Sequence, residues 1–176
     1  MKTRAALTLI AAIAAAAPAV HAQEVRTEKH AVRVVAVARG LAHPWGMAFL
    51  PDGRMLVTER PGRMRLVAGD GRISPPVAGV PEVYARGQGG LLDVTLHPGF
   101  AGNRLIYFTY AEPGPGGAGT AAAFARLSDD GTRLENPKVI FRQEPKAEGG
   151  QHFGSRIVFA SDGRIFITLG ERGQME

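Results

Sequence analysis

His152 is the residue of this chain best placed by its surroundings to move a proton. It lies in the segment EGGQHFGSR at 148–156, among small and polar residues and just before an alternating, strand-like run. Histidine is the usual proton acceptor near neutral pH, and glycines allow backbone dihedrals and a close approach of ligands that other residues resist. Our working hypothesis is therefore that His152 is a catalytic base. On these residues alone, a histidine in an ordinary turn is the alternative.

Gln88 is the second candidate, in the glycine-rich segment RGQGG at 86–90. Its amide could contact a ligand beside glycines that leave room for one. The alternative is a loop amide that satisfies neighbouring backbone groups, which is the commoner role of such a residue.

Other polar and aromatic residues fit structural roles. We expect Trp45 to pack in the core at the start of a strand, and His43 and His97, each followed by proline, to be turn residues. Asp93, inside an apolar strand, is expected to hydrogen-bond a neighbouring loop. The sequence has no H-E-x-x-H motif, serine elbow or aspartate-rich calcium loop. It also has no cysteine, which excludes thiol chemistry and thiolate metal sites.

Short strands must hold these residues in place. An apolar run at 45–50, a turn at 51–53, alternating segments at 54–59 and 63–67, and Pro-Gly at 61–62 predict an antiparallel meander. No segment sustains the 3.6-residue period that would predict a helix.

This strand unit recurs along the chain. Residues 159–168 match residues 49–58 position by position, and a related unit lies between them at 91–110. Strands at 120–127 and 138–142 would complete the middle copy. Repeats of this length built from strands alone predict an all-β fold, a β-propeller, of which the chain would hold about the first two and a half blades. The alternative is a chance repetition of one Asp-Gly hairpin.

Three loops precede the first strands of the three units, at 40–45, 86–90 and 149–154. In a propeller such loops gather at one end of the central channel. We therefore expect Gln88 and His152 to become neighbours in space.

A G-x-G-x-x-G pattern at Gly114, Gly116 and Gly119 is not expected to bind a dinucleotide. Such a site needs a strand, a turn and a long helix, with an acidic residue about 20 positions further on. Prolines stiffen this segment and only a short alanine-rich run follows it. We interpret it as a long surface loop between two strands.

The N-terminus predicts export. Lys2 and Arg4, a short apolar run and the small residues before Gln23 predict a signal peptide over 1–22 that is cleaved after Ala22, and a periplasmic or secreted protein. The remaining part, 23–176, is predicted to be the N-terminal part of a single propeller domain. Its basic residues are interspersed with acids, which excludes nucleic acid as the expected partner. No later stretch could span a membrane, and the strand at the very end of the chain predicts a piece of a longer protein.

Three motifs together resemble one enzyme family. They are G-L-x-H-P-W at 40–45, R-G-Q-G-G-L-L-D at 86–93, and H-F-G-x-R at 152–156 followed by L-G-E at 169–171. In order and spacing they are similar to the soluble pyrroloquinoline-quinone-dependent sugar dehydrogenases, and most of all to the aldose sugar dehydrogenases of the glucose/sorbosone dehydrogenase family. The resemblance covers residues 39–173.

This resemblance implies a six-bladed propeller with pyrroloquinoline quinone (PQQ) and calcium as cofactors, and an aldose as the substrate. His152 would take the proton of the anomeric hydroxyl, while hydride passes from C1 to the quinone, giving the lactone, and an external acceptor removes the electrons. Gln88 and Gln151 would bind the quinone. Gln151 replaces an aspartate of the glucose-oxidising branch, and an amide cannot favour the imidazolium of His152 as a carboxylate would. Arg172 replaces a glutamine of that branch, so glucose specificity does not follow. The calcium and quinone-carboxylate ligands are expected beyond residue 176, and the chain alone is expected to be inactive.

Two other functions stay open on the sequence. One is a calcium-dependent lactonase propeller, which needs inward carboxylate and asparagine ligands that the sequence does not offer. The other is a non-catalytic exported propeller that binds protein or glycan, since a fold does not fix a function.

Overall fold

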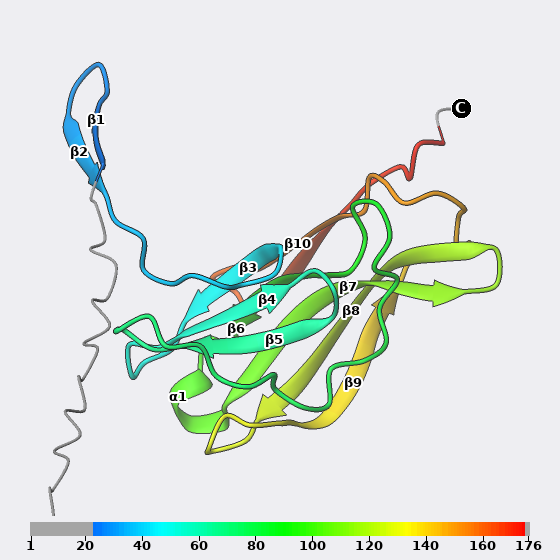
Figure 1. The fold of residues 1–176 in the computed structure, drawn as a ribbon. Helices are drawn as coiled ribbons and strands as arrows, with labels where there is room; N and C mark the ends of the chain where they lie inside the picture. The colour runs from blue at the N-terminus through cyan, green and yellow to red at the C-terminus, as the bar shows by residue number, and fades with distance from the viewer. Residues whose placement is uncertain (1–22, 175–176) are drawn as a thin grey trace, which may run out of the picture. The chain divides into compact units, whose positions relative to one another are not determined.

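The computed structural model describes residues 23–174, so the predicted signal peptide at 1–22 lies outside the described part. The chain divides into two compact units, up to Ala36 and from Val37 onward. The first contains an antiparallel hairpin of β1 (Gln23–Arg26) and β2 (Ala31–Val34) (Figure 1). The sequence predicted a strand over 32–37, and the observed strand ends at Val34.

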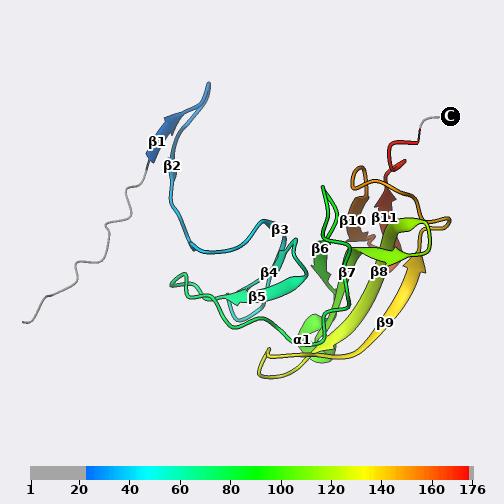
Figure 2. The ribbon, with the colours of Figure 1, turned by 45° about the vertical axis from the view of Figure 1, so that its right-hand side comes forward.

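The second unit consists of three antiparallel sheets that follow one another along the chain (Figures 1 and 2). The first holds β3 (Pro44–Phe49), β4 (Met55–Glu59) and β5 (Arg63–Val67). The second holds β6 (Leu91–Leu96), β7 (Leu105–Gly114), β8 (Gly117–Leu127) and β9 (Leu134–Arg142). The third holds β10 (Gly154–Phe159) and β11 (Ile165–Leu169). The predicted all-β propeller blades are confirmed, with every predicted strand present.

Matching Asp-Gly turns explain the sequence repeat. Asp52 accepts a hydrogen bond from the Arg54 amide at 3.0 Å, and Asp162 accepts one from the Arg164 amide at 3.1 Å. Each aspartate is followed by a glycine with φ near +84°, a conformation that suits glycine. The turn chemistry therefore sets the same β3–β4 and β10–β11 hairpins in two places.

The segment 97–103, between β6 and β7, contains a one-turn helix, α1 (Phe100–Asn103). One local prediction was wrong. The glycine pattern at 114–119 forms a tight hairpin between β7 and β8, in which Gly114 pairs with Gly117, and not a long surface loop. The reason is packing: a Cβ on Gly117 would lie 2.1 Å from the Ala147 carbonyl oxygen and one on Gly119 would lie 2.7 Å from that of Gln143. The glycines allow the 143–147 segment to run close beside the strand.

Threonines tie the sheets together through their first strands. β3, β6 and β10 each carry a register irregularity, where a strand loses its regular partner. There the amides of Gly46, Asp93 and Arg156 donate to the hydroxyls of three threonines, Thr58, Thr109 and Thr168, at 2.8, 3.0 and 2.9 Å. Thr58 in turn donates to the Leu92 carbonyl of the next sheet at 2.5 Å, and Thr109 to the Ser155 carbonyl at 2.6 Å. The hydroxyls of Thr58 and Thr109 thus each accept an amide left unpaired in their own sheet and donate to a carbonyl of the next sheet.

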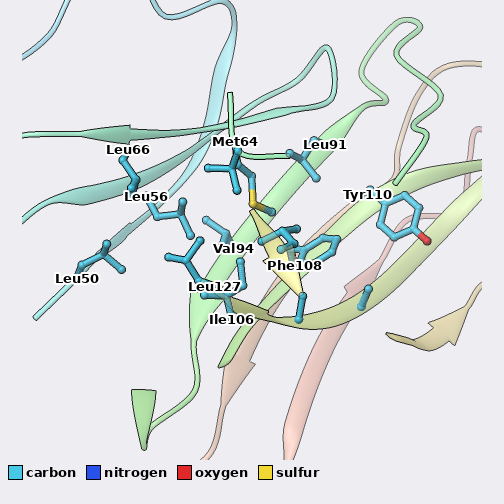
Figure 3. Close-up of a cluster of buried hydrophobic side chains, with 14 of the residues drawn as sticks. Leu50, Leu56, Met64, Leu66, Leu91, Val94, Ile106, Phe108, Tyr110 and Leu127 are labelled. Carbon is cyan, nitrogen blue, oxygen red and sulfur yellow. The ribbon is translucent and has the colours of Figure 1, made fainter. Parts of the chain in front are cut away.

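The main core lies between the first two sheets. Alternating apolar residues of β4 to β8 meet there, and Figure 3 shows their side chains pointing toward one another. Among them are Leu56, Met64, Leu91, Ile106 and Phe108. A second, smaller cluster of Leu92, Ala111, Ala118 and Phe153 joins β6, β7 and β8 to the segment that precedes β10. Within residues 23–174 no helix is long and apolar enough to cross a membrane.

Candidate functional site

The loops at 86–90 and 149–154 meet, as the sequence predicted. The backbone N–H of Gln88 donates to the Gly150 carbonyl at 2.6 Å, and the backbone N–H of His152 donates to the side-chain oxygen Oε1 of Gln88 at 2.9 Å. Only small residues allow this approach, because a Cβ on Gly87, at φ +57°, would lie 2.3 Å from the Gly150 oxygen. The two candidates of the sequence are therefore direct neighbours.

The third predicted loop reaches the same place through Arg60. The Arg60 amide donates to the His43 carbonyl at 3.0 Å, and the Leu91 amide donates to the Arg60 carbonyl at 3.0 Å. The Arg60 guanidinium also donates to the Gly87 carbonyl. The segments that open β3, β6 and β10 thus converge as expected for one end of a propeller.

His152 is paired with a carboxylate. Its ring atom Nδ1 is in hydrogen-bond contact with Oε1 of Glu171, from the loop after β11, and both side chains are about half exposed. The hydrogen bond from His152 holds the pKa of Glu171 below its usual value, which favours the ionised carboxylate. With Nδ1–H on the carboxylate, Nε2 carries the lone pair and can accept a proton.

Glu171 was missed as a site residue by the sequence reasoning. In the sequence it stands only as the last residue of the L-G-E motif at 169–171, and with Gln151 in place of an aspartate no carboxylate is expected beside His152. One signal could have found it: Glu171 follows β11 directly, and β10 and β11 form one hairpin. Because the two ends of a hairpin lie side by side, a residue just before β10 and one just after β11 are expected to meet.

A small cleft lies beside the pair. Its volume is about 100 Å³, and it is lined by Trp45, Gln88, Leu92, His152, Phe153 and Gly154. Trp45 is half-buried and packs against the second core cluster, so the predicted packing role is confirmed, but its ring also forms a wall of this cleft. The Arg156 guanidinium lies over the same ring, 4.8 Å from its centroid. The cleft thus presents one imidazole, one amide and an aromatic surface.

Gln151 is placed differently from Gln88. Its side chain is exposed and lies against Gly173, where a Cβ would come within 2.5 Å of its Nε2. Its carbonyl accepts a hydrogen bond from Nε of Arg172 at 2.8 Å. The lining of the cleft includes Gln88 and His152 and does not include Gln151.

Asp93 corrects one expectation. It was predicted to bond a neighbouring loop, whereas its carboxylate accepts from the Ile157 amide at 3.1 Å and pairs with the Arg156 guanidinium at 3.0 Å, both in strand β10. The cause is the contact between first strands, which brings β6 beside β10. His97 behaves as the predicted turn residue, since its Nδ1 accepts the Gly99 amide at 2.9 Å.

The donor groups of the site suit an oxygen-rich organic ligand better than a metal ion. Gln88 uses Oε1 for the His152 amide, and within residues 23–174 its Nε2 has no hydrogen-bond partner, so two N–H groups are left for a ligand carbonyl. The same residues hold no group of three or more His, Cys, Asp or Glu side chains that could bind a metal. The side-chain N–H groups of Gln88 could donate to a carbonyl of such a ligand.

The sequence and the fold were compared with known proteins. The family model described as glucose/sorbosone dehydrogenase matches residues 41–176. The aldose sugar dehydrogenase YliI of Escherichia coli (strain K12) is 48% identical over 145 residues, which are 81% of this chain and 39% of that protein. The chain therefore spans about two fifths of the length of this relative.

Solved structures agree. A crystal structure of a glucose dehydrogenase is 57% identical, with a TM-score of 0.76 over 78% of this chain and 40% of the other. The PQQ-bound form of an aldose sugar dehydrogenase from Streptomyces coelicolor is 28% identical, with a TM-score of 0.70 over 89% of this chain and 45% of the other. Each comparison matches most of this chain to less than half of a longer protein.

Proposed function

The chain belongs to the glucose/sorbosone dehydrogenase family, and from this premise we propose that the full-length protein oxidises an aldose at C1 to the lactone, with PQQ as its cofactor and an external electron acceptor. The observation that carries the proposal is the His152–Glu171 pair, fixed by Gln88 at the rim of a cleft. A binding module would have no need of a histidine held with one ring nitrogen on a carboxylate and the other open to a ligand.

His152 is the proposed general base. Nε2 accepts the proton of the anomeric hydroxyl as the C1–O bond gains double-bond character, and Glu171 stabilises the imidazolium that forms. The electron pair of the C1–H bond must leave as hydride, and the bound quinone supplies the two-electron acceptor for it. The proton is released from His152 to solvent, to which its side chain is half exposed.

Gln88 and Gln151 are the proposed quinone-binding residues of this chain. The Nε2 group of Gln88 can donate to a quinone carbonyl while Oε1 keeps the His152 amide, so one side chain would align the base and the cofactor. Gln151 lies one residue before the base with an exposed amide and would contact the edge of the quinone. Calcium enters the proposal through the family resemblance alone, and no step above depends on it. The signal peptide predicted over 1–22 supports a periplasmic or secreted location for this reaction.

Dye-linked oxidation of aldoses by the full-length protein, with and without added PQQ and calcium, tests the proposal. His152→Asn should lower turnover by roughly 100-fold, the range expected for loss of a general base. Asparagine suits the test because it tolerates left-handed backbone, and His152 has φ +53°.

His43→Asn is the matched control, since His43 has φ +50° and is exposed. It should keep the wild-type turnover. Wild-type protein that oxidises no aldose in the presence of PQQ and calcium would refute the proposed function. A His152→Asn variant with normal turnover would place the base elsewhere.

A further inference from the structure

We propose that Arg172 is the positioning residue of this site, holding the main chain on both sides of His152 so that the His152–Glu171 pair and the Gln88 contact persist. The inference rests on the proposed function for its kinetic consequence and on geometry for its substance. Arg172 directly follows Glu171 in the sequence, but its guanidinium donates to backbone carbonyls and not to the His152 ring or the Glu171 carboxylate.

The guanidinium of Arg172 is buried and donates hydrogen bonds to three backbone carbonyls. Only 5% of the residue is exposed, although it carries a full charge. Nε donates to the Gln151 carbonyl at 2.8 Å, Nη2 to the Gly149 carbonyl at 2.8 Å, and Nη1 to the Ala118 carbonyl. Two of these acceptors lie in the loop that carries His152, and the third lies in β8 of the neighbouring sheet. The planar fork of arginine can satisfy all three at once.

The same guanidinium reaches the Gln88 loop through an aromatic ring. Its central carbon lies 3.6 Å from the centroid of Phe153, the residue after His152. The far edge of that ring packs on Gly89, where a Cβ would come within 3.0 Å of it. Arg172 therefore contacts the residues on both sides of His152, Gln151 and Phe153. Through the Phe153 ring it also supports the loop of Gln88, whose side chain accepts the hydrogen bond from the His152 amide.

The backbone explains why such support is needed. His152 and Arg172 have φ of +53° and +60°, a left-handed conformation that non-glycine residues seldom hold without support. Both lie beside the His152–Glu171 contact. Without the three carbonyl bonds, we expect the loop to relax and the imidazole to leave its carboxylate.

Arg104 provides a matched control. It too has positive φ, +54°, donates to backbone carbonyls, those of Leu127 and Ser128 at 2.9 and 2.7 Å, and lies over a phenylalanine ring. Arg104 directly precedes β7. Ala118, whose carbonyl accepts from Arg172, pairs with Pro113 at the opposite end of β7. Substituting Arg104 removes a similar arginine that is distant from the site.

The experiment compares Arg172→Gln, Arg172→Lys and Arg104→Gln in the full-length protein by hydrogen–deuterium exchange and by steady-state kinetics. Both Arg172 variants should speed exchange in the peptide 149–153 while leaving the 157–167 hairpin protected as in the wild type. Turnover should fall by roughly 100-fold, the cost of misplacing a reacting group, with little change in the KM for the aldose. Arg104→Gln should change neither. Lysine keeps the positive charge but lacks the planar donor group that bonds three carbonyls at once. The Arg172→Lys variant therefore still tests the inference if Arg172→Gln does not fold.

Two results would overturn the inference. One is unchanged exchange at 149–153 in the Arg172 variants, and the other is an equal acceleration there in Arg104→Gln, which would mean general loosening. A wild-type protein without quinone-dependent oxidation would refute the proposed function instead, and the exchange measurement would still decide the role of Arg172.

Discussion

His152 presents its imidazole from a backbone conformation that is uncommon for any residue but glycine. Such conformations persist where surrounding contacts determine them, and they concentrate at functional sites. Here the amide of His152 is held by Gln88 and its ring by Glu171. At the scale of single residues, the site therefore consists of one proton acceptor and the groups that fix its orientation.

Glu171→Gln tests that orientation. The amide keeps the size of the side chain but can present N–H instead of oxygen to Nδ1 and cannot stabilise an imidazolium. We expect turnover of the full-length protein to fall by roughly 10- to 100-fold, as for loss of a partner that orients a functional histidine. Steady-state kinetics with a saturating aldose measure it. Wild-type turnover in this variant would contradict a role for Glu171.

The same variant carries a pH prediction. The pKa of Glu171 is lowered in the folded protein from 4.5, first of all by the hydrogen bond from His152. A lowered pKa contributes stability that is present above the unfolded value and is lost as the pH falls through the folded value. The stability advantage of the wild type over Glu171→Gln should therefore be present above pH 4.5 and shrink in more acidic buffer. Urea unfolding at a series of pH values measures it.

At the scale of elements, the threonine hydroxyls are the links between sheets. Thr109 is fully buried, accepts the Asp93 amide and donates to the Ser155 carbonyl, three residues after His152. The position of β10, and with it of the His152 loop, thus depends on a hydroxyl in β7. Asp93 adds a second link between the same two sheets through the Ile157 amide.

Thr109→Val should destabilise the full-length protein by about 2 kcal/mol, because valine has the same shape but leaves a buried amide and a buried carbonyl without partners. Thr95→Val is the control: Thr95 lies in the neighbouring strand β6 and is only half-buried, so its replacement should cost much less. Equilibrium unfolding in urea measures both. Equal losses would mean that the hydroxyl of Thr109 is not a link.

At the scale of the whole molecule, the outer sheets of the second unit each expose an apolar face. Phe49 of β3 is 67% exposed and Phe166 of β11 is 55% exposed; Met47 on β3 and Val158 on β10, which pairs with Phe166, are exposed as well. The face on β3 borders an apolar hollow of about 310 Å³. Such contiguous apolar surface is uncommon on an isolated soluble protein and marks a place of contact.

The chain of residues 23–176 on its own is expected to self-associate through these faces. Phe49→Lys combined with Phe166→Lys should shift it toward the monomer, since charge on an exposed apolar face opposes contact. Sedimentation velocity measures the change. Lysine at Arg54 and Arg164, which already carry charge at turns outside these faces, provides the control. A monomeric wild-type chain would contradict the expectation.

The sequence by itself determined the strands, the turns and the main candidates. Alternation of apolar residues and Asp-Gly turns act over a few positions, so β3 to β5 and β10 to β11 could be predicted closely. The glycine-rich segments around Gln88 and His152 could likewise be recognised, together with the family motifs. Their mutual contact followed from the propeller hypothesis.

Only the tertiary structure decided what surrounds His152. Glu171 and Arg172 lie about 20 positions away and come close to it because β10 and β11 pair. Gln88 contacts it from the loop before β6, and Ala118 of β8 contacts Arg172. The tight β7–β8 hairpin and the bond from Asp93 to β10 were mispredicted for the same reason. These contacts depend on how whole sheets pack against one another, and such packing leaves no periodic trace in the local sequence.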